Sequence, residues 1–340
     1  MNRLTIKSVE ATNNRLSVRF DCAGQIRKFF TENVFFVEYD TSIEDVPEAF
    51  LVIPFLASAC PVAWACRADV YVETVDENFL AALGEVKKTF QRFYPEVGFS
   101  GNIHADNIVK PDVGLHSKSM MLFSGGADSI LSYINHRDEK PVLVCVNGAD
   151  VELTNHEAWN TVVETSQDFA GKTGSQLRTL QSNFRSILDE LMIATYYEKK
   201  IHASWWGGVM FGLAFLGLCA PLTYIDKIGK LYLASSYTKE FSHPLGSHPD
   251  IDNNVKWTGT TVMHDGYEFS RQEKLFVIAD YIKATGHKFV IRSCWETEKN
   301  ANCSVCEKCS RTILGLELAG IDPNECGYGV NANTFPAMKK

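Results

Sequence analysis

Four cysteines near the C-terminal end stand at spacings that suit a bound metal ion. They follow the pattern C-x8-C-x2-C-x2-C, which places the last three on one tight knuckle. Four thiolates satisfy a tetrahedral zinc ion without added water, and this makes a closed structural site. Cysteines also hold iron–sulfur clusters, so the kind of metal stays open at this point. The predicted ligands are Cys294, Cys303, Cys306 and Cys309.

A second segment, 123–129, has the composition of a loop that binds phosphate. It follows an apolar run and precedes a helix-like segment. The adjacent glycines Gly125 and Gly126 let backbone N–H groups converge on one point, and a helix N-terminus adds partial positive charge. Ser124 and Ser129 add hydroxyl donors. The alternative is a plain turn with a Ser or Asp helix cap. The full string Ser-Gly-Gly-Ala-Asp-Ser favours the cradle, although it is not a Walker loop.

This string resembles the signature of the PP-loop ATP pyrophosphatase superfamily, over about residues 118 to 320. The resemblance implies that the loop binds the pyrophosphate half of ATP, while a substrate oxygen attacks the α-phosphate and pyrophosphate leaves. Asp128 is then expected near the magnesium ion or the phosphates, with Ser129 beside it. The nucleotide-binding residues implied are Ser124, Gly125, Gly126, Ala127, Asp128 and Ser129.

The cysteine pattern and the following Arg311 make the chain similar to the 7-cyano-7-deazaguanine synthase (QueC) group. In that family a deazaguanine carboxylate is adenylated and then attacked by ammonia. Related proteins join the activated acid to another amine, including a protein N-terminus. The resemblance implies an AMP-forming C–N ligase that uses ATP, Mg2+ and Zn2+. The first 115 or so residues have no counterpart in the compact synthase, and their layout resembles, more weakly, PP-loop enzymes that act on peptidoglycan precursors.

Further polar residues are candidates for the same site. Arg271 and Lys274 lie three apart, which places them on one face of a predicted helix, where they could neutralise charge on the α-phosphate. Plain surface charges are the alternative. Asn147, at the end of a predicted strand, and Asp150 are expected at the lip of the adenosine pocket. The segment 242–274 also holds polar side chains expected in a ligand-binding loop: His243, His248, Asp250, Asp252, His264, Asp265 and Glu268.

The elements that must position these residues alternate between strand and helix. Apolar runs at 120–123, 141–146, 176–179 and 230–234 predict strands, and 129–135, 157–171 and 184–197 predict helices. This order predicts an α/β fold with a doubly wound parallel sheet, and the resemblance implies that the sheet is of the PP-loop type. Residues 1–115 predict an N-terminal α+β domain for substrate or partner recognition, joined by a linker at 98–119. Residues 116–340 predict the catalytic domain, with a strand at 288–292 leading to the zinc knuckle at 294–309.

Composition and charge set the class of protein. Apolar residues make up 45% and charged residues 22% of 340, which is typical of a soluble globular chain. The net charge of −8 argues against a nucleic-acid partner. Residues 203–222 carry no charge and are long enough to span a bilayer, but four glycines and an α/β context favour a buried helix. Trp205 and Trp206 are expected in that core. The scattered cysteines indicate a reducing, cytoplasmic location.

The predicted function is ATP-dependent adenylation of a carboxylate, with ATP, a small-molecule acid and an amine donor as partners. No membrane partner is expected, and homodimer formation is left open. One alternative is a PP-loop enzyme that acts on a peptidoglycan-precursor carboxylate or transfers sulfur to a nucleobase. The other is a nucleotide-binding regulatory module without turnover. Four thiolates leave a bound metal ion without an open position, and this argues against sulfur transfer. The intact Ser and Asp residues of the loop argue mildly against a regulatory module without turnover.

Overall fold

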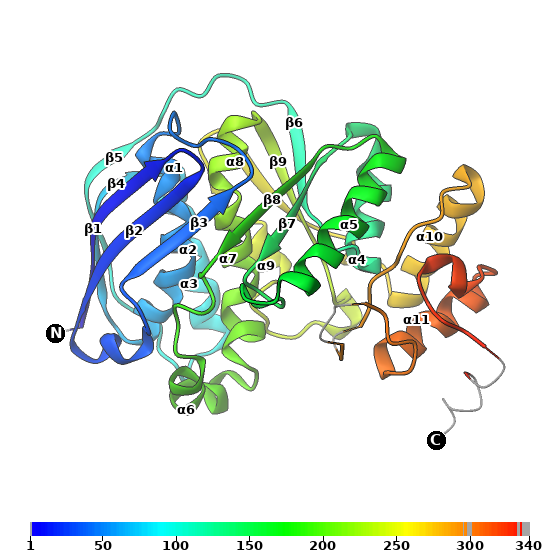
Figure 1. The fold of residues 1–340 in the computed structure, drawn as a ribbon. Coiled ribbons are helices and arrows are strands. Elements are labelled where there is room, and N and C mark those ends of the chain that lie inside the picture. Colours follow the sequence, from blue (N-terminus) through cyan, green and yellow to red (C-terminus); the bar gives the residue numbers. More distant parts are fainter. Residues whose placement is uncertain (1, 295, 298–300, 332–333, 335–340) are drawn as a thin grey trace. The chain divides into compact units, whose positions relative to one another are not determined.

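A computed structural model describes residues 2–294, 296–297, 301–331 and 334 (Figure 1). The chain is an α/β protein with a large, mostly parallel sheet and a cysteine cluster near its C-terminal end. The strand order is β10-β11-β9-β6-β7-β8-β3-β2-β1-β4-β5. The chain forms two compact units. Unit 1 comprises residues 1–120, 180–233 and 243–264, and unit 2 comprises 121–179, 234–242 and 265–340.

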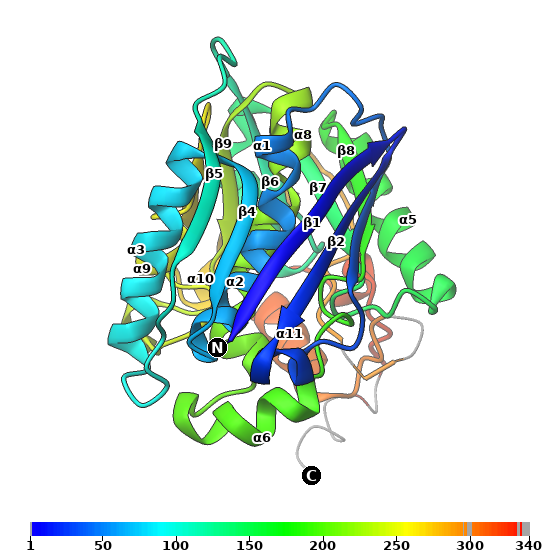
Figure 2. The same cartoon turned by 90° about the vertical axis from the view of Figure 1, so that its left-hand side faces the viewer.

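Unit 1 begins with a hairpin. β1 (Arg3–Thr12) pairs antiparallel with β2 (Arg15–Ala23), which pairs with β3 (Val34–Tyr39). β4 (Asp69–Asp76) runs parallel to β1, and β5 (Ile103–Val109) runs parallel to β4. In Figure 2 the strands β1 and β2 lie in front of α1 (Glu48–Leu51) and α2 (Ile53–Ala65). α3 (Glu77–Phe93) follows β4 directly, because Asp76 caps it.

The uncharged segment 203–222 belongs to unit 1 and lies in a broken helix that packs within the unit. It comprises the π-helical turn Trp206–Met210, α7 (Phe211–Leu218) and α8 (Ala220–Ile225). Trp206–Ile225 is long and apolar enough to cross a membrane by length and composition alone, and 83% of that window is buried. A Cβ on Gly217 would lie 2.3 Å from the Cβ of Ala57, so glycine lets α7 approach α2 closely. Trp205 is buried and Trp206 half-buried.

Unit 1 is completed by shorter elements. α6 (Glu190–Ile201) begins later than the predicted helix at 184–197, because Asp189 caps it. β9 (Ile228–Ala234), α9 (Pro249–Asp252), β10 (Lys256–Trp257) and β11 (Thr260–Asp265) follow. Segment 180–233 belongs with 1–120 partly because β8 (Leu177–Ser182) pairs with β3 through its last residues. The compact units therefore cross the boundary expected near residue 115, and a recognition role for 1–115 stays a prediction.

Unit 2 has the alternating order that the sequence predicts. β6 (Lys118–Leu122) leads through the loop to α4 (Ala127–His136), then β7 (Val142–Asn147), α5 (His156–Thr173) and β8. α10 (Arg271–Thr285) packs on α4 and on α11 (Glu307–Leu318). The rings of Phe123, Tyr133 and Phe289 each lie within 5.0 Å of the Phe169 ring, centroid to centroid, and form an aromatic core.

Two predicted elements are wrong. The predicted linker at 98–119 contains the strand β5. The exposed side chains of this strand are mostly polar, so the sequence alone does not indicate a strand, and its pairing with β4 identifies it. The predicted strand at 288–292 is an irregular segment. Its backbone N–H groups form hydrogen bonds with two separate segments of the chain. Ile291 N–H donates to Cys326 O at 3.1 Å, and Arg292 N–H donates to Gly125 O at 2.8 Å.

Candidate phosphate loop and metal centre

The loop between β6 and α4 turns at Gly125, whose φ is +70°. Left-handed backbone costs any residue with a Cβ about 1–2 kcal/mol, which explains glycine here. Ser129 Oγ lies inside the turn, where it donates to Gly126 O at 3.1 Å and contacts Ser124 Oγ at 3.3 Å. Its hydroxyl therefore holds the loop together from within, and Ser129 is buried.

The N-terminus of α4 is left open. Its N-cap is Gly126, and no side chain of the described residues caps it. The alternative reading of a Ser or Asp cap therefore does not hold for this helix. Among the described residues, the backbone N–H groups of Gly125, Ala127 and Asp128 have no acceptor. Uncapped N–H groups at a helix start, together with the helix dipole, form a binding site for an anion.

Asp128 does not cap the helix because Lys274 binds its carboxylate. Lys274 Nζ donates to Asp128 Oδ1 at 2.7 Å and to the backbone oxygen of Ser235. The Lys274 side chain is 2% exposed, and that of Asp128 is 27% exposed. Lys274 reaches this place from the first turn of α10, where a capping box of Ser270 and Glu273 fixes the helix start.

Arg271 shares that first turn with Lys274. Its Nη2 donates to Thr312 Oγ1 on α11 at 2.9 Å. Its Nε lies buried and has no acceptor among the described residues. A buried guanidinium N–H without an acceptor is costly, so an anionic ligand beside it would be favourable.

Arg292 is a residue that the sequence analysis did not single out. Its Nη1 donates to Ser124 O at 2.6 Å, and its side chain packs over Gly125, where an added Cβ would meet its Cδ at 3.4 Å. Burial lowers the pKa of Arg292, while Cys145 and Asp150 act in the opposite direction. Its Nε is also buried without an acceptor in the described part of the chain. Its backbone and side-chain contacts with Ser124 and Gly125 identify it, and no sequence motif marks it.

Lys308 is a second cation that the sequence analysis missed. Burial and the Arg271 guanidinium lower its pKa, whereas the carboxylates of Asp150 and Asp128 raise it. Lys308 therefore lies within electrostatic reach of the loop residue Asp128. Asp150 acts on both Lys308 and Arg292, which places this predicted pocket residue among the same charges.

Asp265, at the end of β11, binds side chains from the C-terminal half of α4. It accepts from His136 Nε2 at 2.8 Å, from Asn135 Nδ2 at 3.3 Å and from Ser132 Oγ. Burial alone would raise its pKa, but the hydrogen bonds from His136 and Ser132 bring the pKa below its usual value. Its backbone oxygen accepts from Ser235 N–H at 2.8 Å, so Asp265 supports the strand end that also holds Lys274.

Asn147 and Asp252 have hydrogen-bond partners within their own units. Asn147 is buried, and its Oδ1 accepts from the N–H of Gly148 at 3.0 Å. The predicted ligand loop 242–274 is divided between the units. In unit 1, Asp252 is fully buried, accepting from His264 Nδ1 and from Ser247 Oγ, each at 2.7 Å. That cluster is a buried structural network of unit 1.

The cysteine cluster is assembled as the spacing predicts. The four Sγ atoms of Cys294, Cys303, Cys306 and Cys309 lie within 4.8 Å of one another. Burial raises the pKa of the Cys294 thiol, but hydrogen bonds from the Cys303 and Glu296 backbones lower it to about 6. An easily ionised thiol suits a metal ligand. All ten cysteines, which lie in the described part, are free thiols, and these four could hold a metal ion such as zinc.

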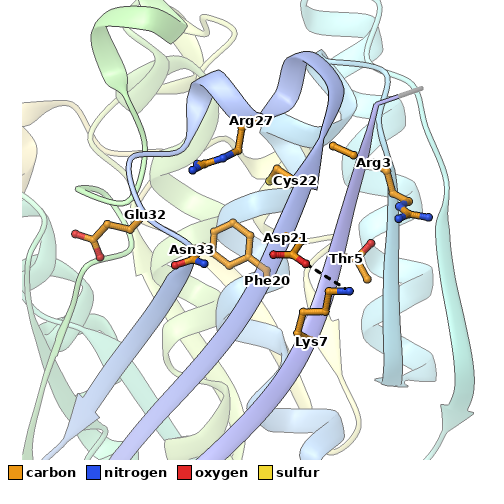
Figure 3. A pocket seen from close by; sticks show the side chains of 10 residues that line it. Arg3, Thr5, Lys7, Phe20, Asp21, Cys22, Arg27, Glu32 and Asn33 are labelled. Carbon is orange, nitrogen blue, oxygen red and sulfur yellow. Dashed lines mark ion pairs between the residues drawn. The ribbon is translucent and has the colours of Figure 1, made fainter.

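A separate hollow lies in unit 1, with a cavity volume of about 320 Å³ (Figure 3). It is lined by three cations and two carboxylates, among them Lys7 and Asp21, whose charged atoms are 3.4 Å apart. No residue predicted from the sequence to bind a ligand lines it.

No family model, curated protein or solved structure matches this chain.

Proposed function

We propose that this chain is an ATP-dependent, AMP-forming enzyme that adenylates a carboxylate and passes the acyl group to ammonia or an amine. The observation that carries the proposal is the uncapped start of α4, where the N–H groups of Gly125, Ala127 and Asp128 have no acceptor among the described residues. The resemblance of 124–129 to the PP-loop signature supplies the class of ligand, a nucleoside triphosphate held by its outer phosphates.

The charges around the loop support the same ligand. Arg271, Arg292, Lys274 and Lys308 bring four cations near two carboxylates, Asp128 and Asp150. Four cations against two carboxylates leave an excess of positive charge for a polyphosphate to neutralise. The buried Nε atoms of the two arginines add donors that need an acceptor.

The proposed chemistry has two steps. A carboxylate oxygen of the substrate attacks the α-phosphorus of ATP, the bond to the bridging oxygen breaks, and pyrophosphate leaves. The nitrogen nucleophile then attacks the acyl carbon, AMP leaves, and the nitrogen loses its proton. The chain contributes by positioning ATP and by stabilising the charge that develops on the phosphates, and it needs no covalent nucleophile. Magnesium, bound with ATP, would screen the phosphate charge, and Asp128 and Asp150 are the carboxylates that could hold it.

We propose the chemical class of the substrate, a carboxylic acid, and name two candidate acids. A 7-carboxy-7-deazaguanine-like acid follows from the resemblance, and the additional N-terminal residues favour a different acid or acceptor. A peptidoglycan-precursor carboxylate is the other acid to test. The proposed location is the cytoplasm.

The direct test is ATP–pyrophosphate exchange. Purified protein is incubated with MgATP, labelled pyrophosphate and one candidate carboxylate at a time. We expect label to enter ATP only when the correct acid is present, because adenylation is reversible before the amine attacks. Formation of ADP, or ATP binding without exchange for any acid, would contradict the proposal and favour a kinase or a regulatory module. A Lys288→Gln variant, which lacks one exposed cation of unit 2, is the control and should exchange label as the wild type does.

A further inference from the structure

Arg292 binds two consecutive carbonyl groups of the loop between β6 and α4. Its backbone N–H donates to Gly125 O at 2.8 Å, and its Nη1 donates to Ser124 O at 2.6 Å. Both glycines of the loop pack closely against this residue. An added Cβ would lie 3.4 Å from Arg292 Cδ at Gly125 and 3.3 Å from Arg292 O at Gly126. The adjacent glycines therefore leave room for Arg292 in addition to allowing the turn.

The bond to Ser124 O determines the direction of the Gly125 N–H group. The two groups belong to one peptide, and this peptide is trans, since the described part of the chain has no cis peptide bond. In a planar trans peptide the C=O and N–H groups point in opposite directions. By holding the carbonyl group, Arg292 therefore fixes the orientation of an N–H group that has no acceptor among the described residues.

The charge of Arg292 also makes this N–H group a stronger donor. Hydrogen bonds at the two ends of a peptide group polarise each other, and a guanidinium donor is stronger than a neutral one. The second peptide that Arg292 binds, Gly125–Gly126, has its N–H on Ser124 Oγ at 3.3 Å. Of the two peptides, Ser124–Gly125 is therefore the one that offers its N–H to a ligand.

The residues on either side of Arg292 hold it in place. Asn302 Nδ2 donates to Ile291 O at 2.9 Å, and Asn302 Oδ1 accepts from Ser293 N–H at 3.0 Å. Arg292 Nε is nevertheless buried without an acceptor in the described part of the chain. A buried N–H group without an acceptor destabilises the folded state. A role in folding alone would therefore not favour an arginine at this position.

We propose that Arg292 is a positioning residue of the phosphate loop. It orients and polarises the Ser124–Gly125 peptide, so that the Gly125 N–H donates to an oxygen of the pyrophosphate half of ATP. Arg292 acts through this peptide, and the proposal needs no contact between its guanidinium group and the ligand. The inference rests on the proposed function, because it assumes that the loop binds a polyphosphate.

Binding without turnover tests the inference. Inorganic pyrophosphate and MgATP, with no carboxylate present, are titrated by calorimetry into the full chain. Arg292→Met keeps an apolar stem and the backbone N–H but lacks the bond to Ser124 O. We expect this variant to bind about tenfold more weakly, since a charge-assisted hydrogen bond that orients the loop is lost. Arg292→Lys keeps a charged donor and should recover most of the affinity.

A stability measurement separates positioning from folding. Arg292→Met removes a buried N–H group that has no acceptor, and Ser124 is exposed, so water can bind its oxygen. We expect the melting temperature to stay near that of the wild type although the affinity falls. Arg137→Met is the matched control, because Arg137 Nη1 donates to Ile134 O at 2.9 Å at the other end of α4. This control should bind pyrophosphate as the wild type does.

Nuclear magnetic resonance reports on the Gly125 N–H group itself. The sequence has two Ser–Gly pairs, Ser100–Gly101 and Ser124–Gly125. Labelling the serine carbonyl carbon and the glycine nitrogen with stable isotopes therefore selects two amide signals. We expect pyrophosphate to move the Gly125 signal downfield in the wild type, while the Gly101 signal stays in place. In Arg292→Met the shift of the Gly125 signal at saturation should be smaller.

The outcomes separate this inference from the proposed function. If the wild type binds pyrophosphate and ATP but Arg292→Met binds equally well, the inference is wrong and the proposed function stands. If the Gly125 signal of Arg292→Met shows the wild-type shift at saturation, Arg292 assists binding by its charge alone and the inference is again wrong.

Two further results concern the fold and the site. A melting temperature that falls together with the affinity in Arg292→Met would assign Arg292 to folding. An unmoved Gly125 signal in the wild type with bound pyrophosphate would overturn the inference whether or not the variants fold. If the wild type binds neither ligand, both the proposed function and the inference are wrong.

Discussion

Lys274 Nζ lies 2.7 Å from Asp128 Oδ1 and joins the first turn of α10 to the first turn of α4. The pair explains why the carboxylate of Asp128 does not cap its own helix. It leaves the helix N–H groups available while it places one ammonium at the loop.

Replacing Asp128 by Asn should lower the free energy of unfolding by about 1–3 kcal/mol, because the buried ammonium of Lys274 loses its counter-charge. Thermal unfolding followed by circular dichroism measures this change. Asp168→Asn is the control, since Asp168 pairs with Lys172 on the surface and such pairs contribute about 0–1 kcal/mol. Equal losses of stability in the two variants would mean that the buried pair contributes no more to folding than the surface pair does. Under the proposed function, AMP release should also fall in Asp128→Asn alone.

Gly125→Ala and Gly286→Ala form a matched pair for the loop. Both glycines have φ near +70°, so each substitution should destabilise the chain by about 1–2 kcal/mol. A Cβ at Gly286 meets open space, whereas one at Gly125 lies 3.4 Å from the Cδ of Arg292. We expect similar melting temperatures but loss of pyrophosphate binding only in Gly125→Ala. If both variants bind as the wild type does, the loop is not the phosphate site.

Stability should depend on Asp265 at low pH. The pKa of this carboxyl lies below its usual value in the folded chain, despite burial, because His136 and Ser132 donate hydrogen bonds to it. Its contribution is therefore present above the unfolded-state pKa of about 3.9 and is lost as the pH falls through the lower folded value. Urea unfolding between about pH 2 and pH 7 should show this loss in the wild type. Asp265→Asn should have a lower free energy of unfolding at pH 7, and this free energy should fall less as the pH is lowered. An equal fall in the variant and the wild type would mean that other groups cause the pH dependence.

The cysteine cluster should bind about one metal ion per chain, and elemental analysis should identify zinc rather than iron. Cys306→Ser should lower the metal content and the melting temperature, since a structural metal contributes folding free energy. Cys326→Ser, at a buried cysteine outside the cluster, should retain the metal. A Cys306→Ser variant with wild-type stability and metal content would show that the cluster is not a structural metal site.

The sequence predicts several elements to within a few residues because their signals are local. The helix predicted at 157–171 is α5, His156–Thr173, and the strand predicted at 230–234 lies in β9, Ile228–Ala234. The loop glycines and the spacing of the four cysteines are likewise visible in the chain alone, because backbone freedom and metal coordination demand particular residue types. Arg271 and Lys274 were recognisable as neighbours on one helix face.

The tertiary structure decided what distant segments bring to one place. β5 was hidden in the expected linker, since an edge strand with polar side chains is identified only by the strand beside it. Arg292 reaches the loop through a backbone bond to Gly125, and Lys274 binds Asp128 across 146 residues of chain. Residue types and short spacings thus identified the loop and the metal ligands. The surrounding charges depend on packing between α4, α10 and α11, which no local pattern encodes.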